Sequence, residues 1–271
     1  MSVAGQRLFC MQRRPLAVPI TTRVLIVAPF AEELNKCRPL LAQCARALAA
    51  AGAEVWCPDL SGSGDSAGEF ADASWSQWVD ELNAFDAALA LAVPRAVPIY
   101  LAVRSGALLL AAASARLQDF QQSQVLLWQP VLDGERYLQQ FLRLRVMTSR
   151  LSGQDETVQA LLKRLAQGEL LEVGGYGLRA PLTDGLCGAR ANPASLGAAR
   201  ALTIFEFKNS PGAATSLPVV AFAAACQCLG SAVAVQMIEC EQFWATQEIS
   251  APRAVSAATL RALVGLKTLC P

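Results

Sequence analysis

Short runs of Val, Ile and Leu alternate along this chain with Ala- and Leu-rich stretches, and this alternation limits the fold more than any other feature. A run that is apolar at every position indicates a strand buried on both faces, as in a parallel sheet covered by helices. The helical patterns between the runs supply the crossover connections that parallel strands need. We therefore predict an α/β fold with a mostly parallel sheet flanked by helices. Its strands are expected near residues 23–30, 53–57, 98–103, 125–128, 201–207 and 232–238.

One stretch breaks the alternation, and it follows the fourth predicted strand. Residues 133–199 hold two helical patterns, at 137–150 and 157–165, and then a Gly-rich piece. An insertion of this size after a strand is typical of a cap over the strand ends, where open α/β sheets bind their ligands. We divide the chain into an α/β core, residues 1–132 and 200–271, and a cap insertion at 133–199.

The charge balance argues against two classes of partner. The chain has 23 basic and 22 acidic residues, a net charge of +1, so it offers no field for nucleic acid or an anionic membrane. No charged residue lies between Lys208 and Glu239. Pro and Gly interrupt that stretch, so a buried helix and a buried strand explain it better than a membrane span. We expect no nucleic-acid partner, no membrane span and no secretory signal at the N-terminus.

Nine cysteines are scattered along the sequence without a C-x-x-C pair. Their odd number argues against a closed disulfide framework. Several lie inside apolar patterns, where a free cysteine behaves as a small hydrophobic residue. Reduced thiols of this kind are typical of the cytoplasm, and we expect the protein to be located there.

A second constraint comes from the turns that follow two of the predicted strands. Residues 59–66 read Asp-Leu-Ser-Gly-Ser-Gly-Asp-Ser, in which the glycines allow a tight reversal and the acidic groups fix it by local hydrogen bonds. This matches the D-x-x-G-x-G-x-S loop that follows a strand in many α/β-hydrolases. Further along, residues 98–116 read as a strand, a turn and a helix, the setting of a G-x-S-x-G nucleophile elbow.

The elbow itself reads Ala-Val-Arg-Ser-Gly over residues 102–106. The small residues at both ends of this run fit a crowded turn, which puts Arg104 at the apex, where the serine nucleophile is expected. The alternative register puts Ser105 at the apex, but Val103 would then occupy a position that needs a small residue. Ser105 therefore remains a candidate nucleophile, or a capping hydroxyl at the start of the helix.

Four further segments have a recognisable sequence: residues 28–36 (APFAEELNK), 126–131 (LLWQPV), 137–145 (YLQQFLRLR) and 243–249 (FWATQEI). Together with the loop at 59–66 and with Arg104, they resemble the exosortase A system-associated hydrolase 2 family. That system processes and sorts surface proteins in bacteria that make exopolysaccharide. The resemblance runs from about residue 7 to 260. It implies an α/β-hydrolase fold and a role in that context, although a fold does not fix a function.

The chain contains no histidine. A Ser-His-Asp site needs an imidazole to move the serine proton, and Cys-His and histidine-ligated zinc sites are excluded as well. We expect neither a metal nor a cofactor. The family's first-strand loop begins His-Pro-Phe, but Ala28 stands here. Gln242 holds the place of the catalytic histidine, and an amide is no general base near neutral pH. Residues 208–210, Lys-Asn-Ser, stand where the triad acid would be.

On the expected fold, a set of side chains gathers near the carboxyl ends of the strands. The candidate binding residues are Glu32, Glu33, Asp65, Arg104, Gln129, Gln242, Trp244 and Glu248. A guanidinium at an elbow is a bidentate partner for a carboxylate or phosphate. Alternatively, Glu32 or Glu33 neutralises it and fastens the first-strand loop to the elbow. We expect Arg104 to lie within salt-bridge distance of one of these two carboxylates.

Three functions remain open. The first is a degenerate α/β-hydrolase that binds a small molecule or a protein partner. The second is an acyl or ester hydrolase that uses Ser105, or a carboxylate such as Glu32 or Asp65 to activate water. The third is a structural protein whose cap docks on another protein. A free polar pocket at Arg104 favours the first, a Ser105 side chain that faces an oxyanion hole the second, and a filled pocket the third. The sequence leaves the oligomeric state open.

Overall fold

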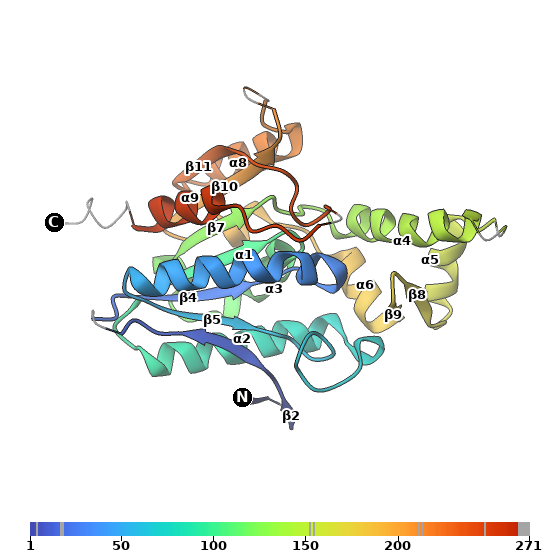
Figure 1. Ribbon diagram of the computed structural model, residues 1–271, viewed down its shortest axis with the longest axis horizontal. Coiled ribbons are helices and arrows are strands. Elements are labelled where there is room, and N and C mark those ends of the chain that lie inside the picture. Colours follow the sequence, from blue (N-terminus) through green and yellow to red (C-terminus); the bar gives the residue numbers. More distant parts are fainter. Residues whose placement is uncertain are drawn as a thin grey trace.

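The computed structural model describes residues 1–264, except residues 4, 17, 18, 152, 154, 211, 213 and 247. Its centre is a seven-stranded sheet in the order β11-β10-β7-β6-β4-β5-β3, in which only the β3–β5 pairing is antiparallel (Figure 1). The strands are β3 (Cys10–Arg13), β4 (Thr22–Val27), β5 (Ala53–Pro58), β6 (Val97–Val103), β7 (Gln124–Trp128), β10 (Ala201–Lys208) and β11 (Val233–Glu239). The predicted fold class and its six strands are confirmed.

Helices cover both faces of the sheet because alternate side chains of the buried strands point to opposite sides. Leu25 of β4 joins one apolar cluster and its neighbour Ile26 joins another. The first cluster packs under α2 (Trp75–Ala92), α3 (Gly106–Ala113) and α8 (Leu217–Cys228), and the second under α1 (Ala31–Ala50) and α9 (Arg253–Val264). The remaining elements outside residues 133–199 are β1 (Ser2–Val3), β2 (Gln6–Arg7), η1 (Phe70–Asp72), η2 (Ser114–Arg116) and η3 (Phe120–Gln122).

We call residues 133–199 the cap segment. The segment contains α4 (Gly134–Leu151), α5 (Val158–Ala166), the hairpin β8 (Leu171–Val173) and β9 (Tyr176–Leu178), α6 (Ala180–Gly188) and α7 (Pro193–Leu196). Its elements from α4 to α6 lie beyond the carboxyl ends of the strands, at the right of Figure 1, whereas α7 packs against α8 and η2. Its longest helix, α4, buries Tyr137, Leu138 and Leu142 at helical spacing. That apolar stripe turns α4 toward the strand ends.

Two expectations about helix and strand environment need correction. Glu32 and Glu33 were expected in a loop, but α1 begins at Ala31 and both lie in its first turn, where the helix dipole favours acidic groups. The stretch between Lys208 and Glu239 forms the expected helix and strand, α8 and β11, but β11 is largely exposed. It is exposed because it is the edge strand of the sheet. Among the described helices, none has the length and hydropathy that crossing a bilayer requires.

Candidate functional site

Arg104 occupies the apex of the turn between β6 and α3. Its backbone is left-handed, with a φ of 53°. This conformation is costly for a residue with a side chain and is concentrated at functional sites. The turn is fixed on both sides, because the Arg104 N–H donates to the Trp128 carbonyl and the Val131 N–H donates to the Arg104 carbonyl. A Cβ at Gly106 would overlap the Val27 carbonyl, which explains the small residue that follows the apex.

The Arg104 guanidinium joins three segments that are distant in sequence. Its Nη2 lies 3.1 Å from Oε1 of Glu33 on α1, so the expected ion pair is present. Its Nη1 donates to the carbonyl of Gln129, which follows β7, at 3.2 Å. Its Cζ lies 4.8 Å from the ring centroid of Trp244, which follows β11, within cation–π distance. The side chains of Arg104 and Glu33 are only 16% and 19% exposed, so solvent screens the pair weakly.

Glu33 reaches Arg104 and Glu32 does not because adjacent residues on a helix point about 100° apart. The Glu32 carboxylate faces outward and lies 3.9 Å from Nζ of Lys36. The two carboxylates that sequence analysis treated as equivalent therefore have different environments. Only Glu33 belongs to the elbow.

Ser105 follows the apex and is buried, with a relative exposure of 3%. The hydroxyl of Tyr137, from the first turns of α4, lies near Ser105 and Glu33, whose buried Oγ and Oε2 atoms have no hydrogen-bond partner within the described residues. Burial, with the Glu33 charge as the next cause, raises the pKa of Tyr137 well above its ordinary value. The phenol therefore stays protonated at neutral pH and is no general base for Ser105.

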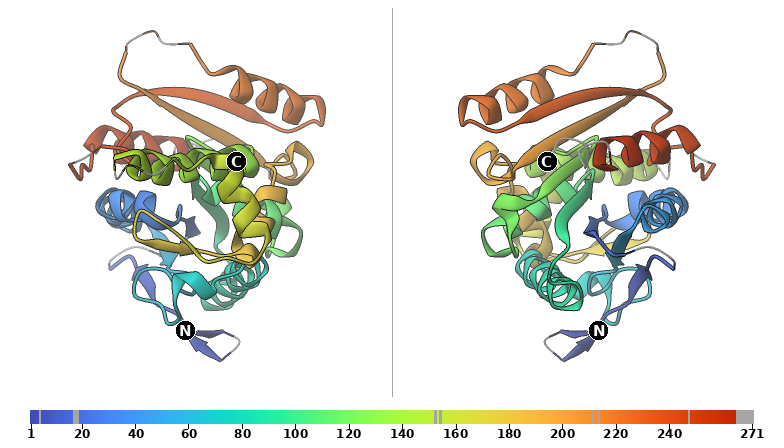
Figure 2. Two further views of the ribbon diagram at one scale, coloured as in Figure 1. Left: turned by 90° about the vertical axis from the view of Figure 1, so that its right-hand side faces the viewer. Right: turned by 90° about the vertical axis from the view of Figure 1, so that its left-hand side faces the viewer.

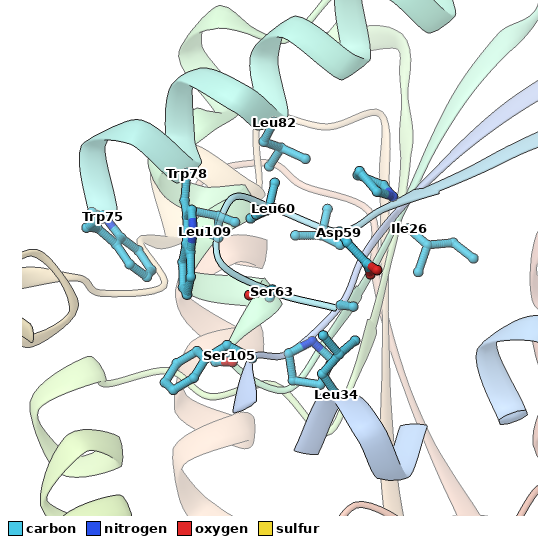
Figure 3. Close-up of a pocket in the computed structure, with 16 residues that line it drawn as sticks. Ile26, Leu34, Asp59, Leu60, Ser63, Trp75, Trp78, Leu82, Ser105 and Leu109 are labelled. Carbon is cyan, nitrogen blue, oxygen red and sulfur yellow. The ribbon is translucent and has the colours of Figure 1, made fainter. Parts of the chain in front are cut away.

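Aromatic side chains fill most of the space in front of the elbow. Phe30 packs against Tyr137 and Phe141 of α4, with ring centroids 5.5 Å and 5.8 Å apart, and against Trp78 of α2 at 5.9 Å. A cavity of about 30 Å³ remains beside Ser105, lined by Trp78, Leu34, Ser63 and Leu109 among others (Figure 3). Such a volume holds about one or two water molecules, and no acyl group. Substrate-sized space is therefore absent from this cavity.

The structure brings some of the candidate residues together and leaves others apart. Those in the network around Arg104 are Glu33, Gln129 through its backbone, and Trp244. The candidates that are exposed and lie outside this network are Glu32, Asp65, Gln242 and Glu248. The Gln129 side chain turns away and accepts a hydrogen bond from the Phe207 N–H at 2.8 Å. Gln129 thereby links β7 to β10.

Sequence analysis missed one member of this network, Tyr137. The available signal was its position at the start of the apolar stripe of α4, directly after the strand that ends beside the elbow. An apolar stripe does not reveal which of its hydroxyls meets a polar group. Tyr137 became a candidate only when the cap segment and the elbow could be seen together.

The described cysteines and acidic residues form neither a disulfide nor a metal-type cluster. The eight described cysteines are free, and Cys270 lies outside the described residues. Burial raises the pKa of Cys44 to about 12 and that of Cys226 to about 11, so these thiols are poor nucleophiles.

A mostly parallel sheet, an elbow between a central strand and a small-residue helix, and an excursion after the next strand define the class of α/β-hydrolase folds. The sequence of residues 22–166, more than half of the chain, matches the family described as serine aminopeptidase, S33. The chain belongs to this α/β-hydrolase family.

Solved structures agree with the fold. The chain is similar to Est1E from Butyrivibrio proteoclasticus with bound ferulic acid, at a TM-score of 0.66 and 14% identity, covering 97% of this chain and 96% of that one. It is also similar to Thermogutta terrifontis esterase 2 phosphorylated by paraoxon, at a TM-score of 0.56 and 14% identity, covering 100% and 94%. No curated protein gives a significant match. At such identities the likeness concerns the fold.

Proposed function

We propose that this α/β-hydrolase-fold protein lacks serine-hydrolase chemistry and instead binds a small-molecule or protein partner at Arg104. We place this role in the exosortase A and exopolysaccharide context that the sequence resemblance implies. One observation carries the proposal: the apex where the class holds its nucleophile is occupied by an arginine ion-paired to Glu33. A guanidinium cannot attack an ester or amide carbonyl, because it stays protonated at any physiological pH.

The surroundings of Ser105 support the absence of acyl-transfer chemistry. The chain has no histidine, and the phenol beside Ser105 is held in its protonated form. The exposed Gln242 supplies only an amide. Without a base, a serine hydroxyl is a weak nucleophile at neutral pH.

Aromatic side chains fill the space in front of the elbow, so binding at Arg104 requires a partner that displaces Glu33. The filled space is what the third function, a structural protein whose cap docks on another protein, would also produce, and that function stays as an alternative. Glu33 occupies the Nε–Nη2 side of the guanidinium, where a bidentate carboxylate or phosphate docks. A partner that carries such a group would replace Glu33, while the Trp244 ring keeps the guanidinium in place. The free state of the eight described cysteines supports a reducing location, and we propose the cytoplasm.

The absence of hydrolysis can be tested with an activated ester, p-nitrophenyl acetate, and with a fluorophosphonate probe. We expect no stoichiometric labelling and the same background turnover in the wild type and in Ser105→Ala. Labelling of Ser105 at one probe per chain, abolished by Ser105→Ala, would overturn the proposal. It would favour the alternative, an acyl or ester hydrolase that uses Ser105.

The binding role can be tested by native mass spectrometry of protein purified from a bacterium that has the exosortase A system. We expect a bound species on the wild type that is lost in Arg104→Ala. Arg46→Ala is the matched control, because Arg46 is an exposed arginine on α1. A wild-type protein without any bound species, or a species that survives Arg104→Ala, would contradict binding at Arg104.

A further inference from the structure

The end of the sheet that carries β11 and α8 has an unusual surface. No charged residue lies between Lys208 and Glu239, a stretch that includes all of α8 and β11 up to its last residue. The two elements lie together at the outer end of the molecule, at the top of both views in Figure 2. Beyond β11, no further strand of the described chain continues the sheet. The edge lacks the devices that usually protect one, such as lysine, proline or an inward charge.

The exposed side chains on α8 form one apolar stripe. They recur at helical spacing on the side opposite to its buried residues, all are uncharged and only Gln227 is polar: Leu217, Pro218, Val220, Ala221, Ala224, Gln227 and Cys228. Leu217 is 83% exposed and Val220 47%. A surface helix usually presents charged or polar groups on this side. The face of α8 that points away from the protein is therefore uncharged and, apart from Gln227, apolar.

Every second residue of β11 directs its backbone hydrogen-bonding groups away from the sheet. The Ala232 carbonyl accepts from the Leu202 N–H, and the Cys240 N–H donates to the Lys208 carbonyl. In a parallel ladder, residues of one parity bond to one neighbouring strand. The even-numbered residues of β11 thus bond to β10. The odd-numbered residues present their N–H and C=O groups at the free edge: Val233, Val235, Met237 and Glu239.

We propose that this edge is the interface of a two-fold homodimer, in which β11 of two copies pairs antiparallel and continues the sheet across both chains. A two-fold axis brings each surface against itself, so it penalises any charged patch and suits an uncharged one. It also forces the two edge strands to run antiparallel. Both copies of α8 then lie on the same face of the joined sheet, where their apolar stripes adjoin.

One register of the strand pair gives hydrogen-bond partners to all four residues whose backbone groups point to the free edge of β11. When the axis passes through Gln236, Val235 pairs with Met237 of the second copy, and Val233 pairs with Glu239 of the second copy. Shifting the axis by one residue leaves at least one of the four without a partner inside β11. In the favoured register the two Glu239 carboxylates lie at opposite ends of the strand pair. The nearest charges of the two copies are thus kept apart.

Charge also favours a second copy over a lipid surface. Helices that lie in a membrane interface are usually rich in Lys and Arg on their polar side, and α8 has neither. A bilayer also leaves the strand edge without hydrogen-bond partners, which a second strand supplies. The unpaired backbone groups and the apolar helix stripe together thus fit a protein surface that offers an edge strand and an apolar helix, as a second copy of this chain does.

The oligomeric state at micromolar concentration tests the proposal by analytical ultracentrifugation. We expect a dimer that dissociates on dilution, and Val235→Lys should raise the dissociation constant about tenfold or more, because it charges both sides of the junction. The matched control is Leu91→Lys on α2, since Leu91 is 83% exposed and lies far from β11 in the sheet order. A wild type that stays monomeric would overturn the proposal. So would equal dissociation constants in the two variants, or a monomer that floats with neutral phosphatidylcholine vesicles.

A cysteine pair tests the register itself, in a Cys228→Ser background that removes the exposed thiol of α8. Gln236 is expected to lie directly opposite Gln236 of the second copy, at a non-hydrogen-bonded position of the antiparallel pair. The two Cα atoms are then about 4.5 Å apart, within the range of a disulfide. Gln236→Cys should therefore form a covalent dimer under mild oxidation. Ala234→Cys, equally exposed, should not, because it faces Ile238 of the second copy. Cross-linking of Ala234→Cys alone would contradict this interface.

Discussion

The loop at residues 59–66 and the elbow follow the two strands that flank β4, yet only the loop also has bonds within its own segment. In the loop, the Asp59 carboxylate accepts from the Asp65 N–H at 3.0 Å, and the Asp59 carbonyl accepts from the Ser66 hydroxyl at 2.5 Å. At the elbow, Arg104 bonds to α1, to the residue after β7 and to the segment after β11. The loop combines these local bonds with bonds to Arg38 of α1 and Glu81 of α2, whereas the recorded partners of the Arg104 side chain all lie in distant segments.

The backbone conformations of the two turns also differ in how much strain they carry. The loop places glycines, Gly62 and Gly64, where φ is positive, so its conformation costs little. The elbow places an arginine at a φ of 53°. A bulky residue persists in that conformation only when its surroundings compensate. The comparison indicates that the loop has a structural role. At the elbow, the strained backbone lowers the stability of the fold but positions the Arg104 guanidinium.

The largest effect is expected in the loop, from Gly64→Ala. A Cβ there would overlap the buried Asp59 carboxylate and the Arg38 guanidinium, in addition to the strain of a φ of 56°. We expect a loss of about 3 kcal/mol or more in the free energy of unfolding, measured by urea denaturation. Gly174→Ala is the matched control, since Gly174 has a φ of 58° with no atom within 4 Å of a Cβ. It should lose only about 1 kcal/mol, and equal losses would mean that backbone strain alone limits the loop.

The next effect concerns the elbow and its partner. Arg104→Ala and Glu33→Gln should each cost about 2 kcal/mol, because each leaves a mostly buried partner without its counter-charge. The double variant should cost about 1 kcal/mol less than the sum of the two. Arg104→Gly should be about 1 kcal/mol more stable than Arg104→Ala, since glycine accepts the left-handed backbone. Additive losses would show that Arg104 and Glu33 do not act as a pair.

A feature of the fold or the site was predictable when the residues that determine it are close together in the sequence. Each of the six predicted strands is an apolar run in the sequence, and each was identified from its own run, as β4 was from residues 23–30. The loop at 59–66 carries part of its own hydrogen bonding, from the Asp59 carboxylate and the Ser66 hydroxyl, so its sequence predicted the reversal. Its bonds to Arg38 and Glu81 come from distant segments and were not predicted. The apex position of Arg104 followed from the size of its neighbours, since Gly106 abuts the β4 backbone.

Other features depended on contacts between distant segments. The Glu33–Arg104 ion pair was expected, but the choice between Glu32 and Glu33 required knowing that α1 starts at Ala31. Pro39 lies inside that helix and obscures its beginning in the sequence, because proline is typical of helix ends. The exposure of β11 was missed since an apolar run looks the same at a sheet edge as at its centre. Edge position is a property of the strand order.

A smaller effect is expected from removing the phenol that reaches the elbow from the cap segment. Tyr137→Phe keeps the packing against Phe30 and removes the hydroxyl that lies near Ser105 and Glu33. We expect a loss of about 1 kcal/mol by urea denaturation. Tyr176→Phe is the control, because the Tyr176 hydroxyl accepts an exposed hydrogen bond from Asn35 at 2.7 Å. A larger loss in Tyr176→Phe would show that the elbow does not depend on the cap hydroxyl.

The smallest effect concerns a charged cluster whose members all lie within the cap segment. The Glu156 carboxylate accepts from the Arg145 Nε at 2.8 Å and from the Arg164 Nη1 at 2.6 Å. These bonds, with Arg145 the first cause, lower the pKa of Glu156 below its ordinary value of 4.5. A lowered pKa means that the folded state favours the charged form. The stabilisation is therefore complete above pH 4.5 and is lost as the pH falls through the folded-state pKa.

Glu156→Gln removes this pH-dependent contribution. Between about pH 6 and about pH 3, the wild type should lose more stability than Glu156→Gln, by less than about 1 kcal/mol because the pair lies near solvent. Thermal denaturation at the two pH values measures the difference, and Glu69→Gln, an exposed glutamate outside the cap segment, controls for the general effect of acid. Parallel pH profiles of the wild type and Glu156→Gln would contradict the lowered pKa. A difference confined to Glu156→Gln would show that the cap segment, unlike the elbow, is stabilised by charges it carries itself.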